Sequence, residues 1–226
     1  MIELRNVHKI YEKSWIALRH VDLQMSKGEF VFLVGPTGAG KTTLLKLIFM
    51  DEKPTSGEVI VLGHSSTDIK SKQLHHLRRK IGVIFQDFKL LNDRDCFDNV
   101  AFALEVTGTP RKIIKKKVLQ VLTQTKLSHK RNCYPFQLSG GEQQKVAIAR
   151  AMVREPSILL ADEPTGNIDP NGTEEVLGLL RNINASGTSV VMATHSTALV
   201  RKYPYRVIRL DCGEIKHNGL YAEGSI

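Results

Sequence analysis

A glycine-rich segment is the first part of the sequence whose residue types and spacing could carry chemistry. Residues 35–42 read Gly-Pro-Thr-Gly-Ala-Gly-Lys-Thr. Glycines permit the backbone angles that turn successive amide N–H groups inward, where they bind phosphate. The lysine behind them can reach the β and γ phosphates of a nucleotide, and the threonine hydroxyl can coordinate Mg²⁺. The predicted nucleotide-binding residues here are Gly35, Pro36, Thr37, Gly38, Ala39, Gly40, Lys41, Thr42 and Thr43.

Two carboxylates form a second candidate site. Asp162 and Glu163 follow the apolar run 157–161, which is typical of a buried strand. Ligands of open α/β sheets bind at the carboxyl ends of strands, so we expect Asp162 to hold Mg²⁺ and Glu163 to polarise the water that attacks the γ phosphate. Adjacent strand residues point to opposite faces, which allows the two carboxylates different roles. An Asp-Glu pair alone is a weak signal, and the phosphate loop makes it a strong one.

The elements that must position these groups indicate an α/β fold. The buried strand 30–34 precedes the phosphate loop, and a helix over 41–50 follows it. The first residues alternate between apolar and polar, which predicts a half-buried strand. We expect this strand to belong to an N-terminal antiparallel β part. The segment 87–156 is mainly helical, so we expect an inserted helical subdomain within a nucleotide-binding core made of residues 1–86 and 157–226. Further strands are expected over 59–62, 81–85, 190–194 and 207–210.

Composition excludes several classes of protein. The chain has 226 residues, of which 42% are hydrophobic, and a net charge of +9, so a disordered protein is excluded. Its longest apolar runs are strand-sized, and the N-terminus has no apolar signal region, so we expect neither a membrane span nor secretion. The three cysteines form no CxxC pair, which predicts neither a disulfide framework nor a zinc site and fits a reducing cytosol.

Most of the excess positive charge lies in one block, residues 106–141. This block carries +8 and contains no aspartate or glutamate. Thr109 and Pro110 predict a helix start, with Thr109 as the cap, and the lysines that follow lie opposite an apolar stripe. A solvated helix face is the favoured interpretation, and contact with anionic lipid or an acidic partner is the alternative. Aromatic residues that could stack on bases are not interleaved with the lysines, so no nucleic acid partner is expected.

One motif indicates the family. Residues 138–144 read Leu-Ser-Gly-Gly-Glu-Gln-Gln before a predicted helix, and this sequence resembles the signature of ATP-binding-cassette (ABC) ATPases. Together with the phosphate loop, it implies a P-loop NTPase core of the ABC type. In that family the signature closes over ATP held by a second copy. The resemblance therefore implies a head-to-tail homodimer with two ATPs at its interface, in which Ser139, Gly140 and Gly141 bind the nucleotide of the partner.

The same resemblance implies roles for four further residues. Gln86 matches the glutamine that contacts Mg²⁺ and the attacking water, and His195 matches the histidine that contacts the γ phosphate and supports the catalytic glutamate. Asp169 lies in the segment that crosses to the other subunit. Tyr11 lies where the family places an aromatic ring against adenine, although Trp15 is a nearby competitor. The catalytic set is therefore expected to be Lys41, Gln86, Glu163 and His195, and the Mg²⁺ ligands Thr42, Gln86 and Asp162.

Within the family, the segment 84–101 resembles FtsE-type ATPases of bacterial cell division. That resemblance implies an integral membrane partner of the FtsX type, control of peptidoglycan hydrolysis, and a peripheral position at the cytoplasmic face of the inner membrane. It also predicts that residues 86–105, including Phe88 and Leu91, line a groove for a helix of that partner. One alternative is the ATPase of a lipoprotein-release or macrolide-export transporter. Another is a nucleic-acid-associated ABC ATPase, which usually has two cassettes or a long coiled-coil or zinc insertion.

Overall fold

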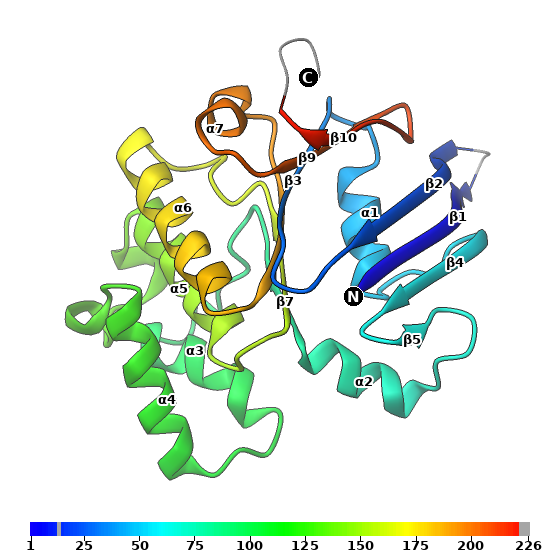
Figure 1. The fold of residues 1–226 in the computed structure, drawn as a ribbon. Helices are drawn as coiled ribbons and strands as arrows, with labels where there is room; N and C mark the ends of the chain where they lie inside the picture. The colour runs from blue at the N-terminus through cyan, green and yellow to red at the C-terminus, as the bar shows by residue number, and fades with distance from the viewer. Residues whose placement is uncertain (13–14, 222–226) are drawn as a thin grey trace.

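A six-stranded sheet forms the centre of the protein (Figure 1). The computed structural model describes residues 1–12 and 15–221. The strand order is β10-β9-β3-β8-β7-β6. All neighbouring strands run parallel except β10, which is antiparallel to β9. Parallel strands are buried on both faces, which explains the continuous apolar runs. The strands are β3 (Phe30–Val34), β6 (Ile81–Ile84), β7 (Ile158–Asp162), β8 (Ser189–Ala193), β9 (Arg206–Asp211) and β10 (Glu214–Leu220).

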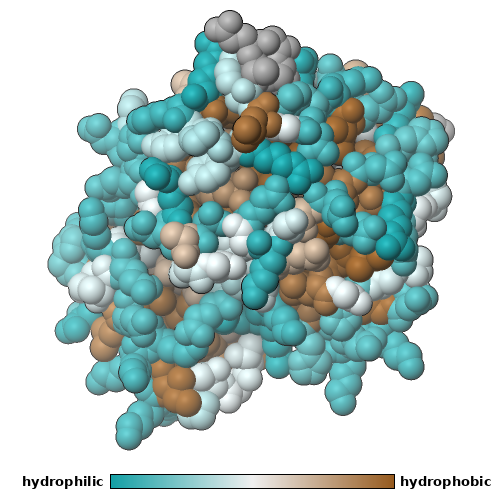
Figure 2. Space-filling model, viewed as in Figure 1, coloured by the Kyte–Doolittle hydropathy of each residue, from teal (hydrophilic) through white to brown (hydrophobic). Residues whose placement is uncertain are grey.

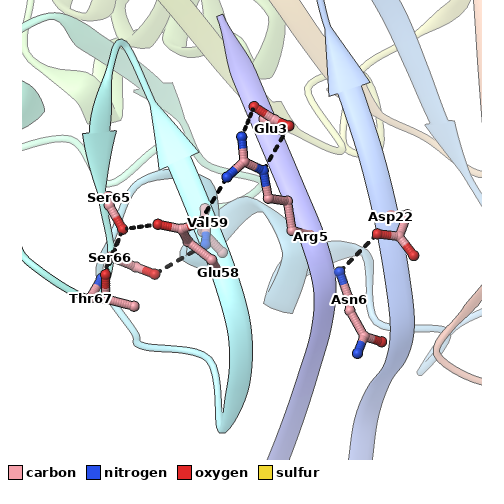
Figure 3. A network of polar contacts seen from close by, with 9 residues as sticks. All are labelled: Glu3, Arg5, Asn6, Asp22, Glu58, Val59, Ser65, Ser66 and Thr67. Atoms are coloured by element: carbon pink, nitrogen blue, oxygen red, sulfur yellow. Dashed lines mark hydrogen bonds and ion pairs between the residues drawn. The ribbon is translucent and has the colours of Figure 1, made fainter.

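A separate four-stranded sheet confirms the predicted N-terminal antiparallel β part. Its order is β2-β1-β4-β5, from β1 (Ile2–Tyr11), β2 (Trp15–Met25), β4 (Ser56–Val61) and β5 (His64–Ser65). Arg5 on β1 faces Glu58 on β4, and its Nη1 donates to Glu58 Oε2 at 3.2 Å while its Nε donates to Glu3 Oε1 at 2.8 Å (Figure 3). Opposite charges on facing strands help to fix the register of the sheet.

Helix α1 (Lys41–Ile48) lies between the two sheets and joins them in one hydrophobic core. Alternate residues of β3 divide between the two faces of its sheet. Val31 and Leu33 pack into the core with α1, whereas Phe30 and Phe32 pack on the other face. That second face is covered by α6 (Pro170–Ala185) and α7 (Thr197–Lys202). Two buried faces anchor β3 firmly, and the phosphate loop begins where this strand ends.

Three helices within residues 87–156 share a hydrophobic cluster of their own. They are α3 (Cys96–Glu105), α4 (Arg111–Gln124) and α5 (Gly140–Met152), with short 3-10 turns at Ser128–Lys130 and Pro135–Gln137, and α2 (Ser71–Arg79) precedes β6. The prediction that Thr109 caps α4 is wrong. Pro110, with an extended ψ of 138°, is the residue before the first helical residue, and the Thr109 hydroxyl lies 3.3 Å from that of Thr107 instead.

Over residues 1–12 and 15–221, we find no helix that combines the length and the apolar character needed to cross a membrane. On the face shown in Figure 2, hydrophilic side chains cover most of the outer surface, and hydrophobic atoms gather chiefly in the hollow between the two sheets.

Candidate active site

The phosphate loop connects β3 to α1, and its glycines are required by its shape. Gly38 and Gly40 have φ angles of 81° and 105°, in the left-handed region that favours glycine. A Cβ atom on Gly40 would lie 2.5 Å from the carbonyl oxygen of Ala17, so no larger residue fits there without moving β2. The loop is therefore held by the backbone of the neighbouring sheet as well as by its own strand and helix.

Lys41 and Thr42 begin helix α1 and point to different partners. Lys41 is buried, and its Nζ donates to the carbonyl oxygens of Gly35 at 2.7 Å and Pro36 at 3.0 Å. The Thr42 hydroxyl donates to Asp162 Oδ2 at 2.8 Å. The structure thus brings together the hydroxyl and the carboxylate that the sequence predicts as Mg²⁺ ligands, although they lie 120 residues apart in the chain.

Asp162 and Glu163 line the same cavity, so the inference that they point to opposite faces is wrong. Strand β7 ends at Asp162, and Glu163 takes a left-handed φ of 48°. The two-residue alternation of a strand stops where the strand stops, and the turn brings Glu163 back to the side of Asp162. A non-glycine residue in this conformation is strained, and such strain is common at functional sites.

His195 follows β8 and lies against Glu163. Its Nδ1 is 2.9 Å from Glu163 Oε2, and the side chains of His195 and Glu163 are 72% and 12% exposed. The two atoms are close but not aligned for a hydrogen bond, so within the described residues Glu163 Oε2 is buried without a hydrogen-bond partner. A buried, unsatisfied carboxylate oxygen is expensive to maintain and is typical of a group that acts on a ligand.

Gln86 follows β6 and completes the predicted catalytic set. Its backbone oxygen accepts a hydrogen bond from Asn167 Nδ2 at 3.2 Å. These groups surround a cavity of about 350 Å³, which lies at the carboxyl ends of the parallel strands, as ligand sites of such sheets do. The lining residues are Trp15, Thr37, Gly38, Gly40, Lys41, Thr42, Thr43, Gln86, Asp162, Glu163 and His195.

Two aromatic rings lie beside this cavity. Tyr11 and Trp15 stack with their centroids 5.2 Å apart and their planes at 20°. Trp15 is 52% exposed and lines the cavity, whereas Tyr11 lies behind it, with its hydroxyl 3.5 Å from that of Thr43. Burial raises the pKa of Tyr11. The aromatic surface that faces the cavity is therefore that of Trp15, which the sequence analysis gives as the alternative to Tyr11 for stacking on adenine.

The signature residues cap a helix away from this cavity. Ser139 Oγ accepts a hydrogen bond from the amide of Glu142 at 3.3 Å, and Glu142 Oε2 accepts one from the amide of Ser139 at 2.9 Å, which forms a capping box at the start of α5. Asp169 caps α6 by accepting from the amide of Gly172 at 2.9 Å. None of the signature residues Ser139, Gly140 and Gly141, nor Asp169, is among the lining residues of the phosphate-loop cavity.

Arg150 is a residue that sequence reasoning missed. From α5, its guanidinium donates to the carbonyl oxygens of Phe88 at 2.8 Å and Lys89 at 2.6 Å, two and three residues after Gln86. Phe88 and Lys89 have φ angles of 58° and 49°, so this arginine holds two successive strained residues. No local pattern distinguishes Arg150 from other helical arginines, and only the fold reveals its contacts.

A second, larger hollow of about 570 Å³ lies between α2, β6, α3 and α5, and we call it the basic groove. Of the predicted segment 86–105, Lys89, Leu91, Phe102 and Ala103 line this groove, whereas Phe88 does not. Docking of a partner helix along the segment 86–105, including Phe88 and Leu91, stays a prediction. Phe88 instead supplies a carbonyl to Arg150.

Comparisons with known proteins agree with this geometry. The family model described as ABC transporter matches residues 18–166. The chain is 49% identical to the cell division ATP-binding protein FtsE of Bacillus subtilis over 95% of this chain and 94% of that protein. It is 44% identical to FtsE of Escherichia coli K12 over 97% and 99%. The resemblance predicted from the segment 84–101 is thereby confirmed.

Solved structures are similar over almost the whole chain. One is a dimeric ATP-binding cassette in a post-hydrolysis state bound to ADP and Pi, with a TM-score of 0.88, 37% identity, and coverage of 97% of this chain and 98% of that one. Another is a dimeric bacterial ABC transporter cassette with the same TM-score and coverage and 38% identity. The predicted α/β fold with a P-loop core is confirmed.

Proposed function

Because this chain belongs to the ABC transporter family and hydrolyses ATP, we propose that two copies close head to tail on two ATP molecules and thereby move a membrane partner. One observation carries the proposal. The phosphate loop and the signature helix are both fully formed, yet the signature does not line the cavity of its own chain. A second copy would supply Ser139, Gly140, Gly141 and the region of Asp169 to complete each site.

The nucleotide would be held mainly by backbone and by one cation. Amides of the loop and the N-terminus of α1 bind phosphate, and Lys41 exchanges its carbonyl partners for phosphate oxygens. Thr42, Gln86 and Asp162 offer the hard oxygen donors that Mg²⁺ prefers, and the 2.8 Å contact between Thr42 and Asp162 fits a shared ligand sphere. Bound Mg²⁺ supplies charge neutralisation for the phosphates.

Glu163 is the proposed general base. Its carboxylate lines the cavity and would accept the proton of the attacking water, and His195, whose Nδ1 lies 2.9 Å from Oε2, would orient it. Gln86 orients the same water. We assign the adenine stack to the aromatic pair, with the exposed face of Trp15 toward the base and Tyr11 supporting it from behind.

The membrane partner would be an integral subunit of the FtsX type, with the pair serving cell division and the control of peptidoglycan hydrolysis. The names of the FtsE relatives support this assignment. We place the chain at the cytoplasmic face of the bacterial inner membrane, attached through that partner in the basic groove. Residues 87–156 would form the helical subdomain that carries both the groove and the signature.

The Glu163→Gln variant tests the ATP cycle. It should bind ATP normally, lower kcat roughly 10²–10⁴-fold, and accumulate as an ATP-dependent dimer on size-exclusion chromatography with light scattering. Glu105→Gln, an exposed carboxylate of α3, is the matched control. If Glu163→Gln turned over ATP at the normal rate, the proposed base would be refuted. If it stayed monomeric with ATP, the proposed dimer would be refuted.

A further inference from the structure

Strands β1 and β2 of the N-terminal sheet each carry a bulge. The register of the two strands shifts on both sides of the pair Val7 and Val21. On the N-terminal side of Val7, β1 contains one residue more than β2, and on its C-terminal side β2 contains one residue more than β1. Asn6 and His20 lie in these bulges with left-handed φ angles of 45° and 44°. Because non-glycine residues are strained in this region and bulges redirect side chains, both positions are candidates for function.

The two bulges bring three polar side chains to one point, and we call Asn6, His8 and His20 the histidine cluster. His20 Nδ1 lies 3.0 Å from Nε2 of His8 and 2.9 Å from Oδ1 of Asn6. The two imidazole rings meet edge to face, with their centroids 4.0 Å apart. Asn6 and His20 are exposed and His8 is half-buried, so a small ligand can reach the cluster from solvent.

The histidine cluster cannot satisfy both of its short contacts with hydrogen bonds alone. An imidazole nitrogen carries either one proton or one lone pair, whereas His20 Nδ1 has two partners, so the two contacts compete. A metal ion accepts lone pairs from several donors at once and would hold all three groups together. Imidazole nitrogens are the commonest protein ligands of transition metals. The convergence of two such nitrogens and an amide oxygen is therefore typical of a metal site.

The spacing of the three donors fits one small ion. Two donors bound at roughly 2.0–2.1 Å from a metal lie about 2.9 Å apart at a right angle and about 3.4 Å apart at the tetrahedral angle. The separations of 3.0 Å and 2.9 Å from His20 Nδ1 agree with this range. Asp22 Oδ1 accepts a hydrogen bond from the amide of Asn6 at 2.8 Å (Figure 3), which holds the bulge of β1 and adds a negative charge beside the cluster. Over residues 1–12 and 15–221, no three histidine, cysteine, aspartate or glutamate side chains gather as a metal site, so the third donor to the histidine pair is the amide oxygen.

We propose that the histidine cluster binds one divalent transition metal ion such as Zn²⁺, through Nε2 of His8, Nδ1 of His20 and Oδ1 of Asn6, with water in the remaining positions. The ion would join β1 to β2, the two strands whose facing ends carry the aromatic pair Tyr11 and Trp15. Nitrogen donors favour Zn²⁺ over Mg²⁺, which prefers oxygen. None of the three cluster residues lines the phosphate-loop cavity, so this site is separate from the nucleotide site and does not depend on the proposed function.

The test titrates Zn²⁺ into the full chain, free of any polyhistidine tag, stripped of metal and without nucleotide, by isothermal titration calorimetry. His8→Thr and His20→Gly should each weaken Zn²⁺ binding at least about tenfold. Glycine adopts the left-handed angle of residue 20 without strain, so His20→Gly removes the imidazole and leaves the fold intact. His129→Gln removes an exposed histidine far along the chain from the cluster and is the matched control, which should bind Zn²⁺ like the wild type.

Thermal unfolding gives a second readout. Because the site exists only in the folded chain, saturating Zn²⁺ should raise the melting temperature of the wild type and of His129→Gln, but not that of His8→Thr or His20→Gly. The double variant should bind little more weakly than either single variant, because both histidines hold the same ion. A wild type that binds no Zn²⁺, or an affinity that either histidine variant leaves unchanged, would refute the shared site. An unchanged affinity in Asn6→Gly would refute the amide oxygen as the third donor.

Discussion

Replacing Arg150 by methionine tests how the fold holds the loop that follows Gln86. The guanidinium of Arg150 makes two hydrogen bonds, to Phe88 O and Lys89 O, and both carbonyls belong to residues in the left-handed region. Methionine keeps most of the aliphatic stem and removes only the donors. We expect residues 87–89 to relax to ordinary backbone angles while the rest of the protein stays folded.

The magnitude follows from two opposing terms. Two charge-assisted hydrogen bonds contribute roughly 3–6 kcal/mol, and two left-handed residues cost roughly 2–4 kcal/mol. Relaxation of the loop loses the hydrogen-bond energy but recovers the strain energy. Burial of the guanidinium, which also lowers the pKa of Arg150, further reduces the net stabilisation that the two hydrogen bonds give. The variant should therefore lose only about 1–2 kcal/mol of unfolding free energy.

The effect on catalysis should be larger than the effect on stability. Gln86 lies two residues before Phe88, so a relaxed loop no longer fixes its side chain at the cavity. We expect kcat for ATP to fall several-fold at an unchanged KM, because Lys41 and the phosphate loop remain intact. Urea denaturation measures the stability and steady-state ATPase assays the rates, with Arg131→Met as the control for loss of an exposed arginine.

A double mutant decides whether the strain is real. In the wild type, Lys89→Gly should stabilise the protein relative to Lys89→Gln, because glycine adopts φ 49° without strain. In the Arg150→Met background the same comparison should show no gain, because the loop has already relaxed. Equal gains in both backgrounds, or an Arg150→Met variant with normal kcat, would refute the reasoning.

Three further predictions concern the phosphate loop, a buried thiol and the basic block. Lys41→Ala should weaken ATP binding at least about tenfold, as measured by equilibrium dialysis, and an unchanged affinity would refute the phosphate-loop assignment. Burial raises the pKa of Cys96 from 9.0 to about 11. The folded state thus favours the neutral thiol. The contribution of this thiol to the free energy of unfolding is complete below pH 9 and declines by about 2–3 kcal/mol as the pH rises toward 11. Urea melts of Cys96→Ala should lack that part of the alkaline decline, and an identical decline in both proteins would contradict it. Replacing Lys115, Lys116 and Lys117 together by glutamine should leave sedimentation with anionic vesicles unchanged if the block is a solvated face, and a loss of sedimentation would show lipid contact.

The fold could be predicted where hydrophobic burial alone decides the structure. The apolar runs that became β3, β7 and β8 are buried on both faces, and their predicted limits agree with the structure to within one or two residues. Strand β10 (Glu214–Leu220) was not predicted, because it is an edge strand with few buried side chains. Its position depends on pairing with β9, which no local pattern encodes.

The site could be predicted where a short motif encodes the backbone. The glycines of residues 35–42 specify their own loop, so the cation and the hydroxyl behind them could be named from the sequence, and both line the cavity. Glu163 shows the limit, because its identity was predicted but its direction was not. The direction of its side chain depends on the left-handed backbone of Glu163 itself, just after the end of β7. Trp15 could be told from Tyr11 only once the structure showed which ring faces the cavity.

Charge counting along the sequence locates the basic block but not the basic groove. The block 106–141 carries +8, but there Lys117 pairs with Glu155 at 2.9 Å, Lys130 lies 3.5 Å from Glu142, and most of the other cations are exposed to water. Exposed charges are screened and contribute little to binding. The cations of the basic groove lie outside the block, and the buried Nη2 of Arg154 has no hydrogen-bond partner within residues 1–12 and 15–221. A charge attracts a partner according to its burial and its lack of compensation, so the few arginines of the groove are the stronger candidates for recognition than the many lysines of the block.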